Sequence, residues 1–297
     1  MEEETIAKMA VIGIGGSGGK VINSMRNKGL KEIELIAIDS DTQDLQASLA
    51  SNKFLCKEDL LIEFENRGSK AQLKKLLSDC DFACIIAGMG GKTGTNLAPI
   101  IAQLAKDCGV LTAVLASRPF RFEGWERRKK AGSMMEMLEQ QVDILIQVTH
   151  PKLLSLYPEA RDKRELFLHA DDYCYQLIKT FRGLLTPGFI RIDLDDISSF
   201  LKNKGTIFTG FGTGASSKQA AKLALTSLFL DDVNLAEAKF LLIHIASSSN
   251  LGILEVYETT QTIQDHVHED VNLIFGWTVD ESVDESVSIT IFATETE

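Results

Sequence analysis

AGMGGKTGTNLAP, residues 87–99, is a glycine-rich segment that directly follows an apolar stretch. Its Gly91, Lys92 and Thr93 match the end of a phosphate-binding P-loop. That motif also requires a glycine five residues before its last glycine, so that backbone N–H groups surround the phosphates ahead of the lysine. Ile86 occupies this position, inside the apolar stretch. The segment is therefore not a literal P-loop, and Lys92 needs another explanation.

Short apolar segments alternate with longer amphipathic ones throughout the first half of the chain. Between the apolar segments, stretches such as residues 98–109 carry apolar side chains at helical spacing and end in a glycine. This alternation predicts an α/β fold with a mostly parallel sheet covered on both faces. The expected strands are residues 8–14, 33–39, 81–88, 110–117 and 142–150.

A long helical pattern begins near residue 165 and ends at Pro187 and Gly188. After it, we expect helices over residues 216–230 and 254–267, and strands over residues 206–214, 239–248, 271–279 and 286–294. These elements predict a second, smaller α/β domain. The expected organisation is a first domain over residues 1–163, a connecting helix over 164–186 and a second domain over 187–297.

Composition excludes several classes of protein. The chain has 297 residues, of which 44% are hydrophobic and 25% charged, as in ordinary globular proteins. Its net charge of −11 argues against binding to nucleic acid or to an anionic membrane. The N-terminal residues lack a signal-peptide pattern and no apolar run is long enough to span a membrane, so we expect a cytoplasmic protein with no direct membrane insertion. The five cysteines lie mostly in apolar segments, which predicts reduced thiols and no metal site.

A first glycine-rich loop follows the first expected strand. Glycines let the backbone approach a ligand closely, and the helix after them offers N–H groups and its dipole to a phosphate. Gly13, Gly15 and Gly18 satisfy the dinucleotide-binding fingerprint, and Asp39 stands 21 residues after Gly18, where an NAD enzyme keeps its ribose-binding acid. Alone, this loop predicts an NAD-dependent oxidoreductase, although a tight turn that packs helix on strand explains it equally well.

A second glycine-rich loop, residues 88–94, follows a later strand of the same expected sheet. Two such loops at the carboxyl ends of parallel strands can hold one phosphate chain from two sides. A dinucleotide-binding fold has no regular use for the second loop. The pair of loops therefore favours another kind of nucleotide-binding protein.

At these residues the sequence resembles the FtsZ family, the bacterial and archaeal relatives of tubulin. The family's glycine-rich signature stands here as GGKTGTN, residues 90–96. Further similar segments follow in family order over almost the whole chain: GIGGSGGKVINSM (13–25), AIDSDTQDL (37–45), RPFRFEGWERR (118–128), LFLHADD (166–172), DLDDI (193–197), DVNLIFGWTVDES (270–282) and VSITIFAT (287–294). The resemblance implies a tubulin/FtsZ-like fold with a parallel-sheet GTP-binding domain, a long central helix and a smaller C-terminal α/β domain.

The resemblance also implies a binding site for GTP or GDP, with Mg²⁺ on the phosphate oxygens. Glu123 and Arg127, four apart at a helix start, would reach the ribose. Phe167 would stack on guanine and Asp171 would accept its N1–H and N2–H; a core aromatic and a surface acid are the plain alternatives. Lys20 and His150 stand where the family has asparagines that contact guanine. The phosphates would be held by Gly15, Gly16, Ser17, Gly18, Gly19, Gly90, Gly91, Lys92, Thr93, Gly94 and Thr95.

Asp193 and Asp196 correspond to the family's two catalytic acids, which enter the nucleotide pocket of the next subunit and polarise the attacking water. The resemblance thus implies a GTPase that forms head-to-tail homopolymers for cell division, with division or membrane-tether proteins as partners. A GTP-binding filament or regulator with little hydrolysis is the alternative. An isolated DxxD pattern is otherwise typical of a solvated loop or a helix N-terminus.

Several residues depart from the family pattern. Lys92 and Asn96 replace glycines, Arg191 replaces an asparagine before the catalytic acids, and residues 62–71 are shorter than the usual γ-phosphate loop. Lys20 and Lys92 either supply positive charge to phosphate oxygens or point into solvent. Arg191 either assists at the γ-phosphate or pairs with a catalytic acid.

Overall fold

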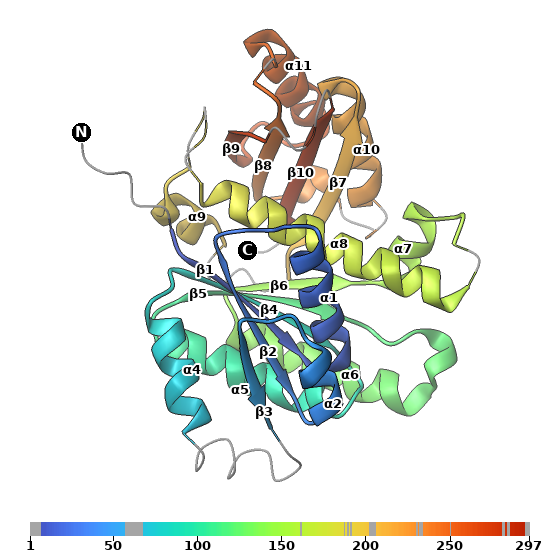
Figure 1. Ribbon diagram of the computed structural model, residues 1–297. Coiled ribbons are helices and arrows are strands. Elements are labelled where there is room, and N and C mark those ends of the chain that lie inside the picture. Colours follow the sequence, from blue (N-terminus) through green and yellow to red (C-terminus); the bar gives the residue numbers. More distant parts are fainter. Residues whose placement is uncertain are drawn as a thin grey trace. The chain divides into compact units, whose positions relative to one another are not determined.

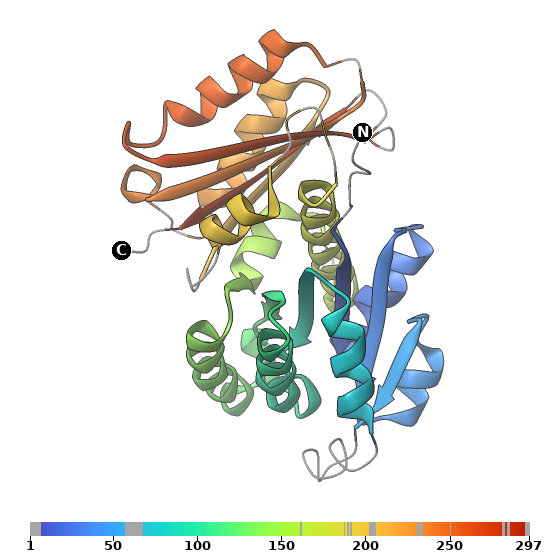
Figure 2. The same ribbon diagram turned by 90° about the vertical axis from the view of Figure 1, so that its left-hand side faces the viewer.

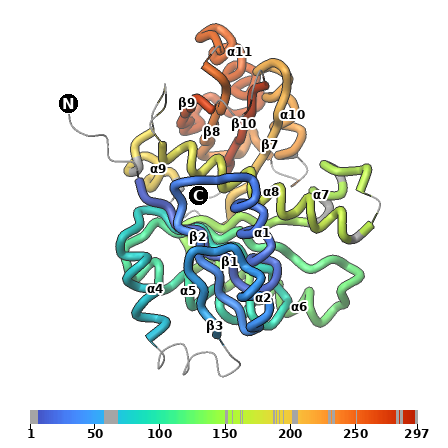
Figure 3. The backbone as a smooth tube through the Cα atoms, viewed as in Figure 1, coloured from blue at the N-terminus to red at the C-terminus, as the bar shows by residue number. Residues whose placement is uncertain are grey.

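The computed structural model describes residues 7–56, 68–160, 162–186, 188, 190, 192–201, 206–229, 231, 234–249, 251–280, 283 and 286–294. The described chain divides into two compact units, Ala7–Ile178 and the residues from Lys179 onward (Figures 1 and 3). This division falls within the long helix that the sequence predicts. The domain boundaries expected at residues 163 and 186 stay predictions.

The first unit is built on a six-stranded parallel sheet with the strand order β3-β2-β1-β4-β5-β6. Every residue of β1 is buried, and so are nearly all of β4 and β5, because helices cover both faces of the sheet. The predicted parallel sheet is confirmed, and β3 is a short edge strand that the sequence did not predict. The strands are β1 (Met9–Ile14), β2 (Ile33–Asp39), β3 (Asn52–Leu55), β4 (Phe82–Gly88), β5 (Leu111–Ser117) and β6 (Ile144–Val148).

Two layers of helices cover this sheet (Figure 2). The chain moves along the sheet in one direction from β1 to β2 and in the other from β4 to β5, so right-handed crossovers place α1 and α5 on opposite faces. The strand order reverses between β1 and β4, and ligands of such sheets bind at this reversal, outside the carboxyl ends of the strands. The helices are α1 (Gly15–Asn27), α2 (Thr42–Ala47), α4 (Ser69–Ser78), α5 (Thr93–Asp107), α6 (Trp125–Gln141) and α7 (His150–Leu156), with a 3₁₀ turn η1 (Arg121–Glu123).

The second unit contains a four-stranded sheet with the order β7-β10-β8-β9, in which β10 is antiparallel to β7 and β8, and β8 is parallel to β9. The predicted smaller α/β unit is therefore present. Helix α8 (Lys163–Leu184) begins in the first unit, and its last residues belong to the second. The remaining elements are α9 (Leu194–Leu201), β7 (Phe208–Gly214), α10 (Ser217–Phe229), the 3₁₀ turn η2 (Leu235–Glu237), β8 (Phe240–Ser247), α11 (Ile253–Gln264), β9 (Asn272–Val279) and β10 (Val287–Thr294).

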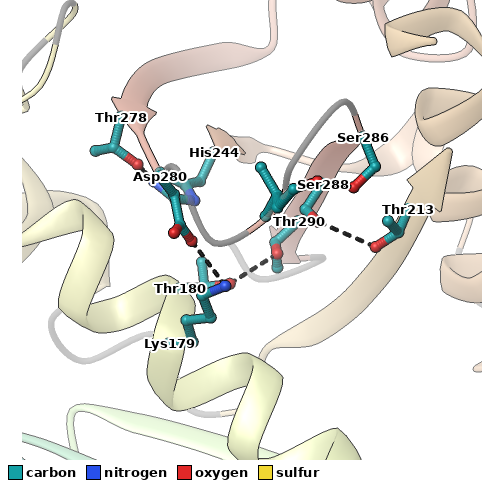
Figure 4. Close-up of polar contacts among 10 residues, drawn as sticks. Lys179, Thr180, Thr213, His244, Thr278, Asp280, Ser286, Ser288 and Thr290 are labelled. Atoms are coloured by element: carbon teal, nitrogen blue, oxygen red, sulfur yellow. Dashed lines mark hydrogen bonds and ion pairs between the residues drawn. The ribbon is translucent and has the colours of Figure 1, made fainter. Parts of the chain in front are cut away.

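The end of α8 is attached to the second sheet by polar contacts (Figure 4). The hydroxyl oxygens of Thr180 and Thr290 lie 2.8 Å apart, and the Lys179 ammonium lies 2.7 Å from the Asp280 carboxylate. Thr290 is buried in β10, so its hydroxyl needs a partner, and Thr180 provides one. These contacts fix the rotation of the helix end about its own axis.

Two glycines of β7 let α10 pack directly on the strand. A Cβ atom at Gly210 would lie 2.2 Å from the carbonyl oxygen of Ala224, and one at Gly212 would lie 2.3 Å from that of Ala220. Both distances are far inside van der Waals contact, and a helix backbone cannot move away without disturbing its other contacts.

We expect Gly212→Ala to lower the free energy of unfolding by about 2 to 3 kcal/mol, because the added methyl group overpacks this contact. Urea denaturation measures the change. Gly252→Ala is the matched control, since its Cβ would come no closer than 3.5 Å to a flexible glutamate side chain. Equal stability of the two variants would contradict the proposed overpacking.

Candidate functional site

A cavity of about 300 Å³ in the first unit lies beside the carboxyl ends of β4 and β5 and the start of α1. Its walls come from segments that are far apart in the sequence: α1, the end of β4 and the loop after it, the end of β5 with the loop and 3₁₀ turn that follow, the start of α6, and the first half of α8. The structure brings seven of the predicted site residues together here, namely Ser17, Lys20, Gly91, Glu123, Arg127, Phe167 and Asp171. Met89, Arg118 and Cys174 also line the cavity; the first two lie in segments quoted above without a role of their own, and Cys174 lies in no motif.

Glycines allow α1 and α5 to begin close to each other. Gly15 has a φ of +69° and Gly90 one of +83°, conformations that favour glycine. A Cβ at Gly18 would lie 2.5 Å from the carbonyl oxygen of Ile86, and one at Gly94 would lie 2.5 Å from that of Gly88. Gly15, Gly18, Gly90 and Gly94 are therefore required by the backbone or its packing, whereas a Cβ at Gly19 would meet nothing within 4 Å.

The N-termini of α1 and α5 have N–H groups available for an anion. Neither helix has a side-chain cap, because Ile14 is apolar and Lys92 carries no acceptor. The hydroxyl of Thr95, in the first turn of α5, is buried and has no hydrogen-bond partner in the described part of the chain. Thr93 is held by Ser40, with 2.8 Å between their hydroxyl oxygens. Two helix starts with unsatisfied donors have the chemistry to hold a phosphate.

A second cavity of about 380 Å³ lies on the β2 side of the start of α1. Gly15, Gly16, Gly19 and Lys20 line it, so Lys20 contributes to both cavities. Two carboxylates, Asp39 and Asp44, also line it, together with Asn23 and Ser48; both acids lie in the segment 37–45 that resembles the family, which gave them no role.

Asp39 is buried, and its burial raises the pKa of the carboxyl although the backbone N–H groups of Ser40 and Asp41 donate to it. No group of three or more His, Cys, Asp or Glu side chains that could hold a metal ion occurs among the described residues. A cation beside Asp39 and Asp44 would therefore take its other ligands from phosphate oxygens and water.

Glu123 and Arg127, the predicted ribose residues, form an ion pair with 2.9 Å between Oε2 and Nη1. The expectation of a single helix start is wrong. Glu123 ends the 3₁₀ turn, Gly124 has a φ of +97° and α6 begins at Trp125. The break turns Glu123 inward, so that its side chain is 15% exposed while that of Arg127 is 57% exposed. Its other oxygen, Oε1, accepts the backbone N–H of Phe120.

Phe167 and Asp171 lie four residues apart on α8 and therefore on one face of the helix. The ring of Phe120 packs edge-on against Phe167 with 5.3 Å between the ring centres. Burial raises the pKa of Asp171 to about 7, and the charge of Lys20 opposes this rise. Burial also raises the pKa of Cys174 to about 12, so its thiol stays protonated in the cavity wall.

The other predicted residues are placed as follows. Gly18, Gly90, Lys92, Thr93, Gly94 and Thr95 lie in the helix starts and the β4–α5 loop but are not in the lining of either cavity. Lys92 is exposed at the N-cap of α5. His150 begins α7, but its side chain lies outside what the structure describes, as do Arg191 and residues 62–67 of the shortened loop.

Asp193 and Asp196, the predicted catalytic acids, lie in the second unit at the start of α9. The carbonyl of Asp193 accepts the N–H of Ile197, so Asp193 is the residue before the helix and Asp196 is its third residue. Both side chains are exposed. Asp196 lines a separate cavity of about 460 Å³ with Phe200 and Phe240. The acids are thus at a helix N-terminus, where the dipole stabilises negative charge, and they are accessible to another molecule.

None of the helices in the described ranges is long and apolar enough to cross a membrane.

Two family models match the sequence. The one described as Tubulin/FtsZ family, GTPase domain, covers residues 8–158, and the one described as FtsZ family, C-terminal domain, covers residues 205–297. Among solved structures, the chain is similar to an empty FtsZ dimer from M. jannaschii, with 30% identity and a TM-score of 0.88 over 98% of this chain and 89% of that one. It shares its fold with CetZ from Methanosaeta thermophila (17% identity, TM-score 0.77, 98% and 87% covered). The chain also shares its fold with CetZ2 from Haloferax volcanii in a GTPγS-bound protofilament (17% identity, TM-score 0.75, over 98% of this chain and 93% of that one).

Proposed function

Because the chain belongs to the tubulin/FtsZ family, we propose that it is a GTPase that polymerises head-to-tail into protofilaments for cell division. The observation that carries this proposal is the cavity beside β4 and β5, where the start of α1 and Gly91 of the loop before α5 line the same space as Phe167 and Asp171. The dinucleotide fingerprint of Gly13, Gly15 and Gly18 is explained by the strand order, which this fold shares with NAD-binding folds. The family points to GTP, and the oxidoreductase reading loses its support.

Each part of GTP has a matching group in the first unit. The starts of α1 and α5 would hold the phosphates, and Glu123 and Arg127 would reach the ribose. Phe167 would stack on the base, and the Asp171 carboxylate would accept the two N–H donors of guanine. Adenine lacks that pair of donors at the same edge, so Asp171 supplies the selectivity for guanine.

Asp39 and Asp44 fit Mg²⁺ at the phosphate end of the site. They are too few to hold a cation alone, and phosphate oxygens would complete the coordination. Bound Mg²⁺ would neutralise charge on the phosphates. Asp44 is close to the glycine loop, since a Cβ at Gly16 would lie 3.5 Å from its Oδ2, so the two carboxylates need such a cation to tolerate a phosphate nearby.

Hydrolysis would require a second copy of the chain. Asp193 and Asp196 are exposed in the second unit and would polarise water at the γ-phosphate bound by the next copy. A contact between two different faces does not close on itself and so generates filaments. On this proposal the protein works in the cytoplasm at the division site, with division or membrane-tether proteins as further partners. A filament with little hydrolysis is the alternative, which phosphate release from assembled protein distinguishes.

Two measurements test the proposal. Denaturing the purified protein and separating the released nucleotides by chromatography should yield GDP or GTP. Light scattering and electron microscopy should then show polymers that need GTP and Mg²⁺ and appear above a threshold protein concentration. The absence of polymer over a wide range of concentrations, or the release of NAD, would overturn the proposal.

The affinity for GTP should depend on pH through Asp171. Its pKa is about 7, raised by burial and by Asp172 and lowered by Lys20 and Lys28. Guanine needs the carboxylate, so binding below pH 7 requires loss of a proton. We expect a constant affinity above pH 8 and a fall that approaches about tenfold per unit below pH 6. Competition binding from pH 5.5 to 8.5 measures the dissociation constant of GTP. The Asp171→Asn protein shows how much of its pH dependence comes from titration of the phosphate groups alone. Equal slopes in both proteins would contradict the assignment.

A further inference from the structure

The segment between β5 and α6 supports all three parts of the candidate nucleotide site. Its Pro119 packs against the loop after β4, since a Cβ at Gly90 would lie 2.7 Å from Cγ of Pro119. The backbone N–H of Phe120 donates to Oε1 of Glu123, and the ring of Phe120 packs against that of Phe167. One short segment therefore touches the loop proposed for the phosphates, the carboxylate proposed for the ribose and the ring proposed for the base.

Phe120 reaches these groups from behind the cavity wall. Its side chain is 4% exposed, and among the described residues Glu123 and Phe167 line the cavity whereas Phe120 does not. The ring of Phe122 stacks on the ring of Phe120, with 4.8 Å between the ring centres and 12° between the ring planes. Phe120 is thus held by a neighbouring ring, and it would act on a ligand only through the residues that it contacts.

The contact between Phe120 and Phe167 fixes the plane of the Phe167 ring. The two ring planes are 88° apart, with 5.3 Å between the ring centres, which is a preferred arrangement of an aromatic pair. Rotation of the Phe167 ring about its Cβ–Cγ bond would change this angle and lose the favourable contact. A base that stacks on Phe167 lies parallel to its ring, so Phe120 would set the plane of the base as well.

The plane of the base matters for recognition by Asp171. This carboxylate lies one turn after Phe167 on the same face of α8. The N1–H and N2–H groups of guanine point outward in the plane of the base, and a hydrogen bond weakens as it departs from linearity. A tilted base would still stack, but its donors would point away from the carboxylate. The orientation of the Phe167 ring therefore affects selectivity as well as affinity.

We propose that Phe120 is a positioning residue that aligns a bound guanine base with the Asp171 carboxylate by holding the ring of Phe167. The inference rests on the proposed function as a GTP-binding protein. It deepens that function, because it assigns a role in base selectivity to a side chain that contacts no part of the nucleotide. A core phenylalanine that contributes only to stability is the competing explanation that the experiment must separate.

The test compares GTP with inosine triphosphate, which lacks the N2 amine and is otherwise identical. Dissociation constants are measured at pH 8 by competition with a ribose-labelled GTP, and the preference is the ratio of the two constants. We expect the wild-type protein to prefer GTP by at least about tenfold, because inosine triphosphate leaves one oxygen of Asp171 without its donor. Phe120→Leu should reduce this preference about threefold, since leucine is apolar but has no ring.

Phe82→Leu is the matched control. Phe82 is 1% exposed and begins β4, whereas the cavity lies at the other end of that strand, so its substitution should lower stability without changing the preference. Phe167→Leu should lower the preference as Phe120→Leu does. The double variant should have the preference of Phe167→Leu alone, because no ring is left for Phe120 to align.

The proposal is overturned if the wild-type protein does not distinguish the two triphosphates, or if Phe120→Leu keeps the wild-type preference. It is also overturned if Phe120→Leu lowers the preference by the same factor with and without the Phe167 ring, since that result would indicate general damage to the site.

A second variant decides the matter if Phe120→Leu does not fold. Phe122 is 61% exposed, so Phe122→Ala should fold, and it removes the ring that stacks on Phe120. We expect it to lower the preference for GTP in the same direction, and an unchanged preference would then overturn the proposal. A wild-type protein that binds no guanine nucleotide would instead overturn the proposed function.

Discussion

Asp171→Asn protein is expected to bind GTP at least about 100-fold more weakly than the wild-type protein and to bind xanthosine triphosphate in its place. The substituted side chain would present an amide N–H₂ to the two donors of guanine, leaving buried donors without acceptors. A site built to hydrogen-bond one group rejects the wrong group strongly for this reason. Xanthine carries an oxygen in place of the N2 amine and can accept from the amide.

The control for this prediction is the neighbouring acid. Asp172 is paired with Lys28 and is not in the cavity lining, so Asp172→Asn should keep the wild-type preference for GTP. Competition binding with both triphosphates measures the two preferences at pH 8, where Asp171 of the wild-type protein is ionised. An Asp171→Asn protein that still prefers GTP would show that Asp171 does not contact the base.

Asp196→Ala protein is expected to bind GTP normally but to release phosphate at least about 100-fold more slowly, a loss typical of removing a group that positions or polarises the attacking water. Asp196 belongs to the second unit and is not in the lining of the nucleotide cavity, so binding should not change. Phosphate release from assembled protein measures turnover. Asp195→Ala is the matched control, because Asp195 is also exposed in the first turn of α9 but is not one of the two acids.

A mixture of two inactive variants tests whether the acids act on the next copy. Asp196→Ala should bind GTP without supplying the acid, and Asp171→Asn should supply the acid while binding GTP too weakly to fill its own site at a limiting GTP concentration. If catalysis occurs between copies, the mixture should recover a measurable part of the wild-type turnover. A mixture as inactive as either variant alone would contradict hydrolysis by the neighbouring copy, provided that the two variants assemble together.

Much of the fold could be predicted because its signals are local. The buried strands β1, β4 and β5 are continuous apolar runs, and the glycines after β1 and β4 mark the turns into α1 and α5. Strand β3 escaped prediction because it has only four residues, and two of them, Asn52 and Lys53, are polar. An edge strand needs fewer apolar side chains, so its pattern is too weak to recognise.

The candidate site was predictable only where a motif fixed a position. Residues such as Phe167 and Asp171 came from the resemblance, since a Phe and an Asp four apart on a helix carry no signal of their own. Cys174 carried no signal in the sequence either, because its side chain lines the cavity only as a result of how α8 packs. The break at Gly124 depends on a positive φ that a glycine permits but does not require.

The fixed side chain of Glu123 lowers the entropy that would be lost when a nucleotide binds. One of its oxygens accepts the N–H of Phe120 and the other pairs with Arg127, so its rotamer is already fixed before any nucleotide arrives. A mobile glutamate would lose conformational freedom when it bound a ribose, at a cost of about 1 kcal/mol. Here that loss occurs during folding. A bound ribose would therefore meet a preorganised carboxylate, and Arg127 would contribute to affinity by holding Glu123 still.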